Sequence, residues 1–310
     1  MSAVRSAVIP SELLFGTVVP AMVTPMTDEG AVDLEAAAAL AEHLVDRGAD
    51  GLVVTGTTGE TSTLTDDENV AMFRTVVEAV GDRARVVAGT GTNDTAHTLE
   101  LSRRAAETGV DGLLLVTPYY NKPNQAGIRA HFEAVADGVD LPIMLYDIPG
   151  RTGIPLSADT LIRLGEHPRI VAVKDAKGDL WAASEVMAAT DLLWYSGDDV
   201  VNLAWLALGA VGVVSVVGHV AGNEFRAMID AVDAGDLATA RAIHTKFDLG
   251  GDEPGPLGGD GGEPDQRGVA DQVEDGGGDG HGRYLSGVRA SEQGAARGFS
   301  GLSSRPARAT

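Results

Sequence analysis

The residue that first suggests chemistry in this sequence is Lys174, which directly follows a short apolar run. That run, Ile170–Val173, has the composition of a buried strand. Lysine is strongly hydrated and is rarely buried without a partner or a function, and this chain contains only four lysines. Two interpretations stay open from this stretch alone: a catalytic amine, or a surface lysine that pairs with Asp175 or Asp179.

An amine in such a position can attack a ketone and form an imine. The attacking amine must be neutral, so the lysine pKa of about 10.4 has to fall by roughly 3 units, which corresponds to about 4 kcal/mol. Partial burial can lower a lysine pKa by that much. Because the imine is itself an electron sink for making or breaking a carbon–carbon bond, we expect no cofactor beyond the covalent imine of Lys174.

Metal chemistry is not indicated by the residues that would be needed for it. The chain has no cysteine, and its seven histidines show neither His-x-x-x-His nor His-Glu-x-x-His spacing. Thiolate sites and disulfides are therefore excluded, and a zinc site is not expected.

Two threonines in the stretch TGTTGE could hold a small anion. Thr57 and Thr58 lie between two glycines, which allow backbone N–H groups to converge, and their hydroxyls are further donors. No Gly-Lys-Ser/Thr follows, so this is not a nucleotide phosphate loop. An ordinary turn between a strand and a helix is the alternative for this stretch.

Further polar side chains follow other predicted strands. Tyr120 lies in TPYYN, and Tyr146 and Arg151 lie in YDIPGRTG. A tyrosine beside a lysine can transfer protons, and an arginine can bind a carboxylate through two parallel hydrogen bonds. Each aromatic residue taken alone is also compatible with packing. Small residues in SGDD and VVSVVGH leave room for a ligand near Gly197 and Val214.

These candidates follow strands in a regular alternation of strands and helices between about residues 17 and 244. The predicted strands are Val18–Val23, Gly51–Val54, Arg85–Ala88, Gly112–Val116, Pro142–Leu145, Ile170–Val173, Leu192–Tyr195 and Gly212–Val216. The helices between them include Asp33–Arg47, Asp66–Val80, Asp94–Thr108 and Gln125–Asp137, with Asp33, Thr65, Asn93 and Ser157 as N-cap residues.

Eight strands that alternate with helices predict an α/β fold, a parallel (β/α)8 TIM barrel, whose active site lies at the carboxyl ends of the strands. An open doubly wound sheet is the competing architecture. Such a sheet usually has fewer strands and a Gly-x-Gly-x-x-Gly loop after the first one. Here the first strand is followed by TPMTDEG, which favours the barrel.

Composition limits the partners. The chain has 310 residues and a net charge of −22, so a phosphate backbone would be repelled and nucleic acid is not an expected partner. The acidity is explained most simply by solubility. No apolar run reaches the roughly 18 residues of a membrane span, and the N-terminus lacks the long apolar segment of a signal peptide. We expect a cytoplasmic protein with no membrane partner.

The chain divides into unlike parts. We interpret residues 1–16 as an N-terminal extension, 17–235 as the barrel, and 236–249 as the start of a C-terminal helical region. Residues 250–310 contain 17 glycines and no apolar periodicity, which predicts a disordered tail.

Four motifs, in this order on successive strand ends, carry a family resemblance: GTTGE, TPYYN, YDIPGRTG and VKDAKGD. Over about residues 15–244 the chain resembles the dihydrodipicolinate synthase family of pyruvate-dependent Schiff-base aldolases. The resemblance implies that Lys174 forms an imine with pyruvate and that Tyr146 transfers protons. Thr57 would connect Tyr146 to Tyr120 of a neighbouring subunit, and Thr58 would hold the pyruvate carboxylate.

The implied reaction condenses pyruvate with L-aspartate 4-semialdehyde to 4-hydroxy-tetrahydrodipicolinate, at the entry to lysine and diaminopimelate biosynthesis. Arg151 would bind the carboxylate of the semialdehyde, and lyases of sugar acids generally lack this arginine. The alternatives are an N-acetylneuraminate or keto-deoxy sugar-acid lyase, and an inactive keto-acid-binding or truncated product. The family also implies a homotetramer.

Two departures from the family pattern suggest hypotheses. Where lysine-inhibited members carry histidines and an acid in the effector pocket, this chain has Asp66, Asn69 and His97, so we expect weak or absent lysine feedback. The tail stands in place of the family's C-terminal helical domain and is rich in Gly, Ala, Arg and Pro. A frameshift near Thr245–Asp248 would produce that composition, and a genuine lineage-specific tail is the alternative.

Overall fold

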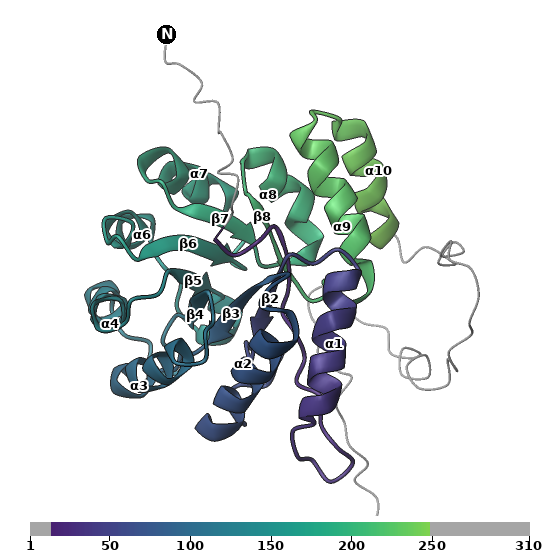
Figure 1. Ribbon diagram of the computed structural model, residues 1–310. Coiled ribbons are helices and arrows are strands. Elements are labelled where there is room, and N and C mark those ends of the chain that lie inside the picture. The colour runs from purple at the N-terminus through teal and green to yellow at the C-terminus, as the bar shows by residue number, and fades with distance from the viewer. Residues whose placement is uncertain (1–13, 249–310) are drawn as a thin grey trace, which may run out of the picture. The chain divides into compact units, whose positions relative to one another are not determined.

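The computed structural model describes residues 14–248, and these residues contain eight parallel strands arranged in a ring (Figure 1). The strands are β1 Val18–Pro20, β2 Gly51–Val54, β3 Arg85–Gly89, β4 Gly112–Val116, β5 Ile143–Asp147, β6 Ile170–Asp175, β7 Leu193–Ser196 and β8 Gly212–Ser215. Each strand from β2 to β7 pairs with the next one in the sequence, and β8 pairs with β1. A bridge between Ala21 and Val53 joins β1 to β2. The predicted TIM barrel is confirmed.

Helices surround the ring and alternate with the strands (Figure 1). They are α1 Leu34–Asp46, α2 Asp66–Val80, α3 Thr95–Ala106, α4 Gln125–Gly138, α5 Pro149–Thr152, α6 Ala158–Leu164, α7 Leu180–Ala189, the 3-10 helix η1 Asp199–Val201, α8 Asn202–Leu208, α9 Gly218–Asp233 and α10 Leu237–Asp248. The predicted N-caps Asp33, Thr65 and Ser157 are confirmed. The prediction of Asn93 was wrong, because the carboxylate of Asp94 accepts the N–H of His97 and caps α3.

Several strand ends differ from the predictions: β1 ends at Pro20 and not at Val23, β8 ends at Ser215 and not at Val216, and other strands extend into polar residues. β5 runs on to Asp147 and β6 to Asp175, beyond the predicted ends at Leu145 and Val173. Neighbouring strands supply ladder partners for these polar residues, so the ladder continues past the apolar run. Lys174 and Tyr146 are consequently residues of the strands themselves, with fixed backbones, and do not belong to the loops that follow.

Side chains alternate along each strand between two apolar layers. One layer fills the ring and includes Val53, Met144, Ala172 and Val214. The other lies between strands and helices and includes Ile143, Leu145 and Val173 of β5 and β6, packed with the inner faces of α1 to α4. In β5 and β6, therefore, Tyr146 and Lys174 belong to the interior register, and the aspartates that follow them belong to the helix-facing register.

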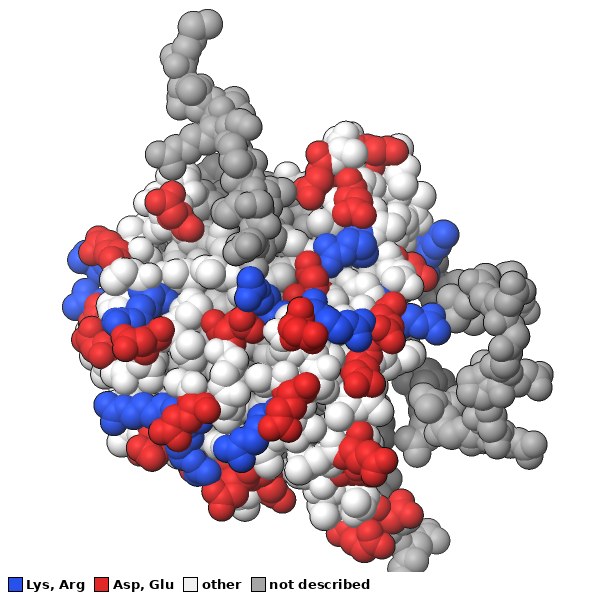
Figure 2. Space-filling view, viewed as in Figure 1, with Lys and Arg blue, Asp and Glu red and all other residues white. Residues whose placement is uncertain are grey.

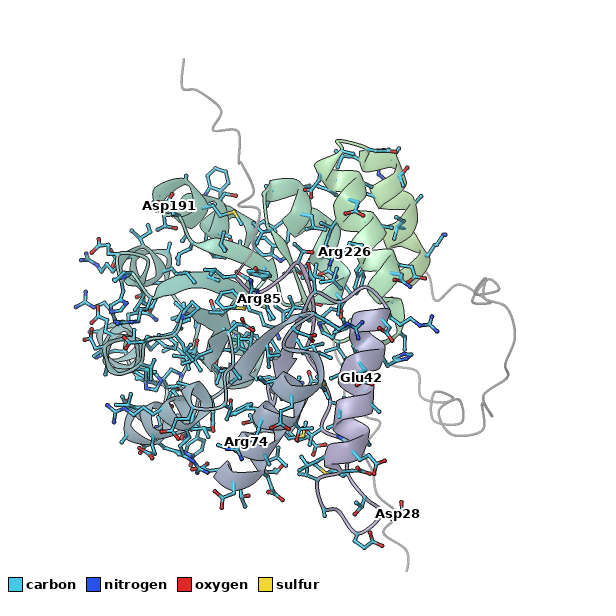
Figure 3. All side chains as sticks on the ribbon, in the orientation of Figure 1. Asp28, Glu42, Arg74, Arg85, Asp191 and Arg226 are labelled. Carbon is cyan, nitrogen blue, oxygen red and sulfur yellow. The ribbon has the colours of Figure 1, made fainter. Side chains whose placement is uncertain are left out.

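At the amino ends of the strands, Asp50 closes the ring between β1 and β2. Its carboxylate accepts the N–H groups of Thr17 and Val18 at 2.7 and 2.8 Å, and it pairs with Arg226 of α9 at 2.8 Å. Figure 3 labels Arg226, on α9, and Arg85, at the start of β3; both lie near the middle of that view. The charged residues at the amino ends of β1 and β2 therefore pair with one another and with the backbone. The carboxyl end of the barrel is the end where an active site is expected.

The last two described helices pack on β1 and β8. An apolar cluster joins Phe225, Met228 and Ile229 of α9 to Val18 and Val213, and it includes Ala240 of α10. The predicted N-terminal extension and Gly-rich tail lie outside the described residues, apart from residues 14–16. Disorder and the frameshift thus stay predictions.

The face drawn in Figure 2 carries acidic and basic side chains interspersed, with no continuous basic patch among the described residues. Among those same residues, 14–248, no helix is long and apolar enough to cross a membrane.

Candidate active site

Lys174 and Tyr146 lie side by side at the carboxyl end of the barrel. They are register partners on β6 and β5, and the Lys174 Nζ lies 4.2 Å from the centroid of the Tyr146 ring. Both side chains are 5% exposed. The strand ladder therefore fixes an amine against a phenol inside the mouth of the barrel, because parallel register and alternation leave neither backbone free to turn away.

Burial lowers the pKa of Lys174 from its ordinary 10.5 to about 8, and the positive charge of Arg151 acts in the same direction while Asp199 opposes it. The face of the Tyr146 ring favours the ammonium by about 0.5–2 kcal/mol, which opposes burial. The pKa of Lys174 is nevertheless lowered, because desolvation is the larger effect. Near neutral pH a larger fraction of this amine is therefore neutral than in an unperturbed lysine.

Tyr146 is kept as a neutral phenol. Burial raises its pKa to about 12, and Asp198 acts in the same direction, while Arg151 and a hydrogen bond with the Thr57 side chain oppose the shift. A phenol that stays protonated can donate its proton to a developing alkoxide and recover it afterwards. Thr57, from the loop after β2, thus interacts with Tyr146, and its place in a proton relay stays a prediction.

The loop after β2 forms a wall of the cavity beside Tyr146. The cavity is lined by Thr55, Gly56, Thr57, Thr61, Gly89, Gly91, Leu114, Val116 and Tyr146. Thr55 is fully buried with a φ of +48°, an uncommon conformation for a non-glycine residue, and it starts a tight turn in which the N–H of Gly59 donates to the Gly56 carbonyl. Thr58 is half-buried in this turn.

Gly197, after β7, leaves the space that the Lys174 side chain occupies. A Cβ at Gly197 would lie 2.9 Å from the Lys174 Cγ and 2.9 Å from the Asp175 carbonyl oxygen. Its N–H donates to the Asp175 carbonyl at 2.7 Å. Val214 of β8 is 1% exposed and belongs to the same interior cluster as Tyr146. Gly197 is thus packed against Lys174, and Val214 lies in the interior cluster of Tyr146; neither lines the cavity beside Tyr146, and their contact with a ligand stays a prediction.

Arg151 lies on the short helix α5 and is exposed. Its charge lowers the pKa of both Lys174 and Tyr146, so it is close enough to interact electrostatically with the pair while its guanidinium reaches solvent. An exposed cation at the rim of a barrel mouth can bind an entering carboxylate.

Asp199 is a site residue that the sequence analysis missed. Its carboxylate accepts the Ser215 hydroxyl at 2.5 Å and the N–H groups of Val216 and Val217 at 3.0 Å each. It raises the pKa of Lys174 and so limits the effect of burial. Asp199 is the last residue of the stretch SGDD, in which the small residues were the feature used for prediction.

Tyr120 is the predicted residue that the single chain does not bring to the site. It is 85% exposed and has a φ of +67°. A large aromatic side chain in the left-handed region and in water is costly on both counts. The described part of this one chain offers no partner that would explain its conformation.

The three predicted effector-pocket residues form polar contacts with their own surroundings. The His97 Nε2 lies 2.9 Å from the Asp66 carboxylate. Asn69 is 2% exposed, and its side-chain amide donates to the Thr65 carbonyl at 3.1 Å. Within residues 14–248 no group of three or more His, Asp or Glu side chains could hold a metal ion.

Comparison with known proteins identifies relatives over most of the chain. The model of the dihydrodipicolinate synthetase family matches residues 14–248. The 4-hydroxy-tetrahydrodipicolinate synthase of Kineococcus radiotolerans is 66% identical over 233 residues, which is 75% of this chain and 76% of that protein. The 4-hydroxy-tetrahydrodipicolinate synthase 2 of Streptomyces coelicolor is 62% identical over 233 residues, 75% of this chain and 78% of its own length.

Solved structures of the same family resemble this chain. The structure of the enzyme from Cyanidioschyzon merolae, determined with lysine bound, superposes with a TM-score of 0.75 at 47% identity. The superposition covers 76% of this chain and 82% of that one.

The space at Gly197 gives a test of the site. In Gly197→Ala the new methyl group displaces the Lys174 side chain, because the carbonyl of Asp175 on its other side cannot move. We expect imine formation with a small 2-keto acid, trapped by borohydride and mapped to Lys174 by mass spectrometry, to slow about tenfold or more. Gly127→Ala, whose Cβ meets nothing closer than 3.4 Å, is the matched control. An unchanged trapping rate in Gly197→Ala would show that the site does not depend on this space.

Proposed function

Because the chain belongs to the dihydrodipicolinate synthetase family, we propose that Lys174 is the amine through which it acts on pyruvate. The reaction is the condensation of pyruvate with L-aspartate 4-semialdehyde to 4-hydroxy-tetrahydrodipicolinate, in lysine biosynthesis. The observation that carries the role of Lys174 is its position: a buried amine with a pKa of about 8 in contact with a neutral phenol.

The first steps follow from the states of these two groups. The neutral Lys174 amine attacks the pyruvate ketone, and Tyr146 donates a proton to the developing alkoxide and regains one from the attacking nitrogen, which gives a carbinolamine. A second proton from Tyr146 lets the hydroxyl leave as water, and loss of the remaining N–H proton back to Tyr146 leaves the neutral imine. Thr58, with the N–H groups of its turn, binds the pyruvate carboxylate. Gly197, which leaves room for the Lys174 side chain, and the apolar side chain of Val214 lie toward the methyl end of the substrate.

The imine is converted to its enamine by loss of a methyl proton, and the enamine carbon attacks the aldehyde of the second substrate. Arg151 binds the carboxylate of that substrate at the rim. Attack of the substrate's own amino group on the imine carbon then closes the ring and releases Lys174. Tyr146 and Thr57 transfer the protons of these steps, which requires no external cofactor.

Tyr120 completes the relay from a second copy of the chain. Its exposed side chain and left-handed backbone are what a residue that reaches into a neighbour would have. We therefore propose a homo-oligomer, with the tetramer of the family as its full form, and a cytoplasmic location for this biosynthetic reaction. The sugar-acid lyases are disfavoured by Arg151, and the names of the relatives agree with the synthase.

The experiment that tests this function combines trapping with turnover. Pyruvate and borohydride should give a mass increase on Lys174 and none in Lys174→Arg. Turnover with aspartate semialdehyde should exceed turnover with sugar-acid aldehydes, and Arg151→Met should raise the KM for the semialdehyde by about 10- to 100-fold, in line with the roughly 1.5–3 kcal/mol of a charge-assisted hydrogen bond. Trapping at another lysine, or preference for a sugar-derived aldehyde, would contradict the proposal.

We further propose that L-lysine regulates this enzyme weakly or not at all. The carboxylate of Asp66 is already paired with His97, and the Asn69 amide is buried and hydrogen-bonded. An arriving ammonium group would have to compete with these contacts. Initial rates should be unchanged by L-lysine at physiological concentration, with D-lysine as the control. The double variant Asp66→His/Asn69→His should gain inhibition, and strong inhibition of the parent chain would overturn the proposal.

A further inference from the structure

Two buried carboxylates lie directly behind the reacting pair. Asp147 and Asp175 follow Tyr146 and Lys174 in β5 and β6, and they are register partners. Their exposed fractions are 0% and 1%. Because side chains alternate along a strand, these carboxylates point toward the helices while Tyr146 and Lys174 point into the barrel.

The countercharge comes from Lys177, in the turn between β6 and α7. Its side chain is 15% exposed, and its Nζ lies 3.5 Å from the Asp147 Oδ2. The Asp175 Oδ1 accepts the N–H groups of Lys177 and Gly178 at 2.8 and 2.9 Å, so the turn that presents Lys177 is fixed to the strand of Lys174. Burial raises the pKa of Asp147 to about 6, and the charge of Lys177 acts against that rise.

The backbone of Leu156 is held from both sides by this cluster. Its N–H donates to the two carboxylate oxygens of Asp147 at 3.2 Å each. Its carbonyl accepts the Nζ of Lys177 at 3.1 Å. Leu156 is 1% exposed, so these groups would be buried without partners if the cluster were lost, which costs about 1–3 kcal/mol for each group.

Leu156 ends the loop that carries Arg151. The loop leaves β5 at Asp147, forms α5 and returns at Leu156, and the Asp147 carboxylate therefore joins its two ends. Inside the loop, the Thr152 hydroxyl contacts the carbonyls of Ile148 and Ile154 at 3.0 Å. The loop is internally braced, so the position of Arg151 depends on how its base is held to the barrel.

We propose that Lys177 is a positioning residue that fixes the Arg151 loop to the strand of Lys174 and thereby sets the distance between Arg151 and the Lys174 amine. The inference rests on the proposed function, because it assigns Arg151 to the second substrate. Lys177 reaches the Arg151 loop through Leu156 and the strand of Lys174 through Asp175. It contacts neither reacting group itself.

The test compares Lys177→Met with Lys246→Met, a lysine on the exposed part of α10. Lys177→Met should raise the KM for aspartate semialdehyde about tenfold, while the KM for pyruvate and the rate of borohydride trapping on Lys174 change less than twofold. Asp147→Asn/Lys177→Met removes both charges, keeps an acceptor for the Leu156 N–H, and should retain the raised KM with restored thermal stability. Lys246→Met should match the parent in every measurement.

Equal effects on both substrates, slowed trapping, or a fall in melting temperature with unchanged KM values would overturn the inference. A parent chain that traps no pyruvate would instead contradict the proposed function. In that case hydrogen exchange still tests the inference: Lys177→Met should accelerate exchange in residues 148–156 and leave residues 170–175 unchanged. Unchanged exchange in residues 148–156 would refute it.

Discussion

Removal of the Lys174 amine from water is the physical constraint on which the rest of the site depends. Burying an ammonium costs free energy and so favours the neutral amine, which is the form that the proposed nucleophile needs. The register of β5 and β6 holds the amine in this buried position. A lysine on a loop could turn its Nζ into solvent and recover its hydration. The strand of Lys174 is paired on both sides, so its side chain cannot turn into solvent, and the amine responds to burial by losing its proton.

Opposing charges then adjust this effect. Arg151 lowers the pKa of Lys174 and Asp199 raises it, and with burial the pKa is about 8. Both protonation states of the amine are then populated near neutral pH, as the proposed reaction requires. The same burial keeps Tyr146 protonated. The same buried environment thus lowers the pKa of Lys174 and raises the pKa of Tyr146. The groups that take part follow or belong to four different strands.

The sequence was sufficient for what depends on local pattern. The alternation of elements predicted the barrel, the β2 and β4 boundaries agree with the structure, and strand-end motifs pointed to Lys174, Tyr146 and Thr57, whose roles stay proposals. Tertiary contacts could not be read from local pattern: Asp199 contacts Ser215, and Lys177 contacts Leu156, 21 positions away. Tyr120 could not be placed by one chain, because its proposed partner is another copy.

The pKa of the Lys174 amine is the quantity that tests this account most directly, and the four lysines of the chain make it measurable. Protein labelled with 13C at the lysine ε-carbon should give four resonances, with the one missing from Lys174→Met assigned to Lys174. Titrated by NMR without substrate, that resonance should have its midpoint near pH 8. A midpoint near 10.5 would show that burial does not activate the amine, and the central claim would be wrong.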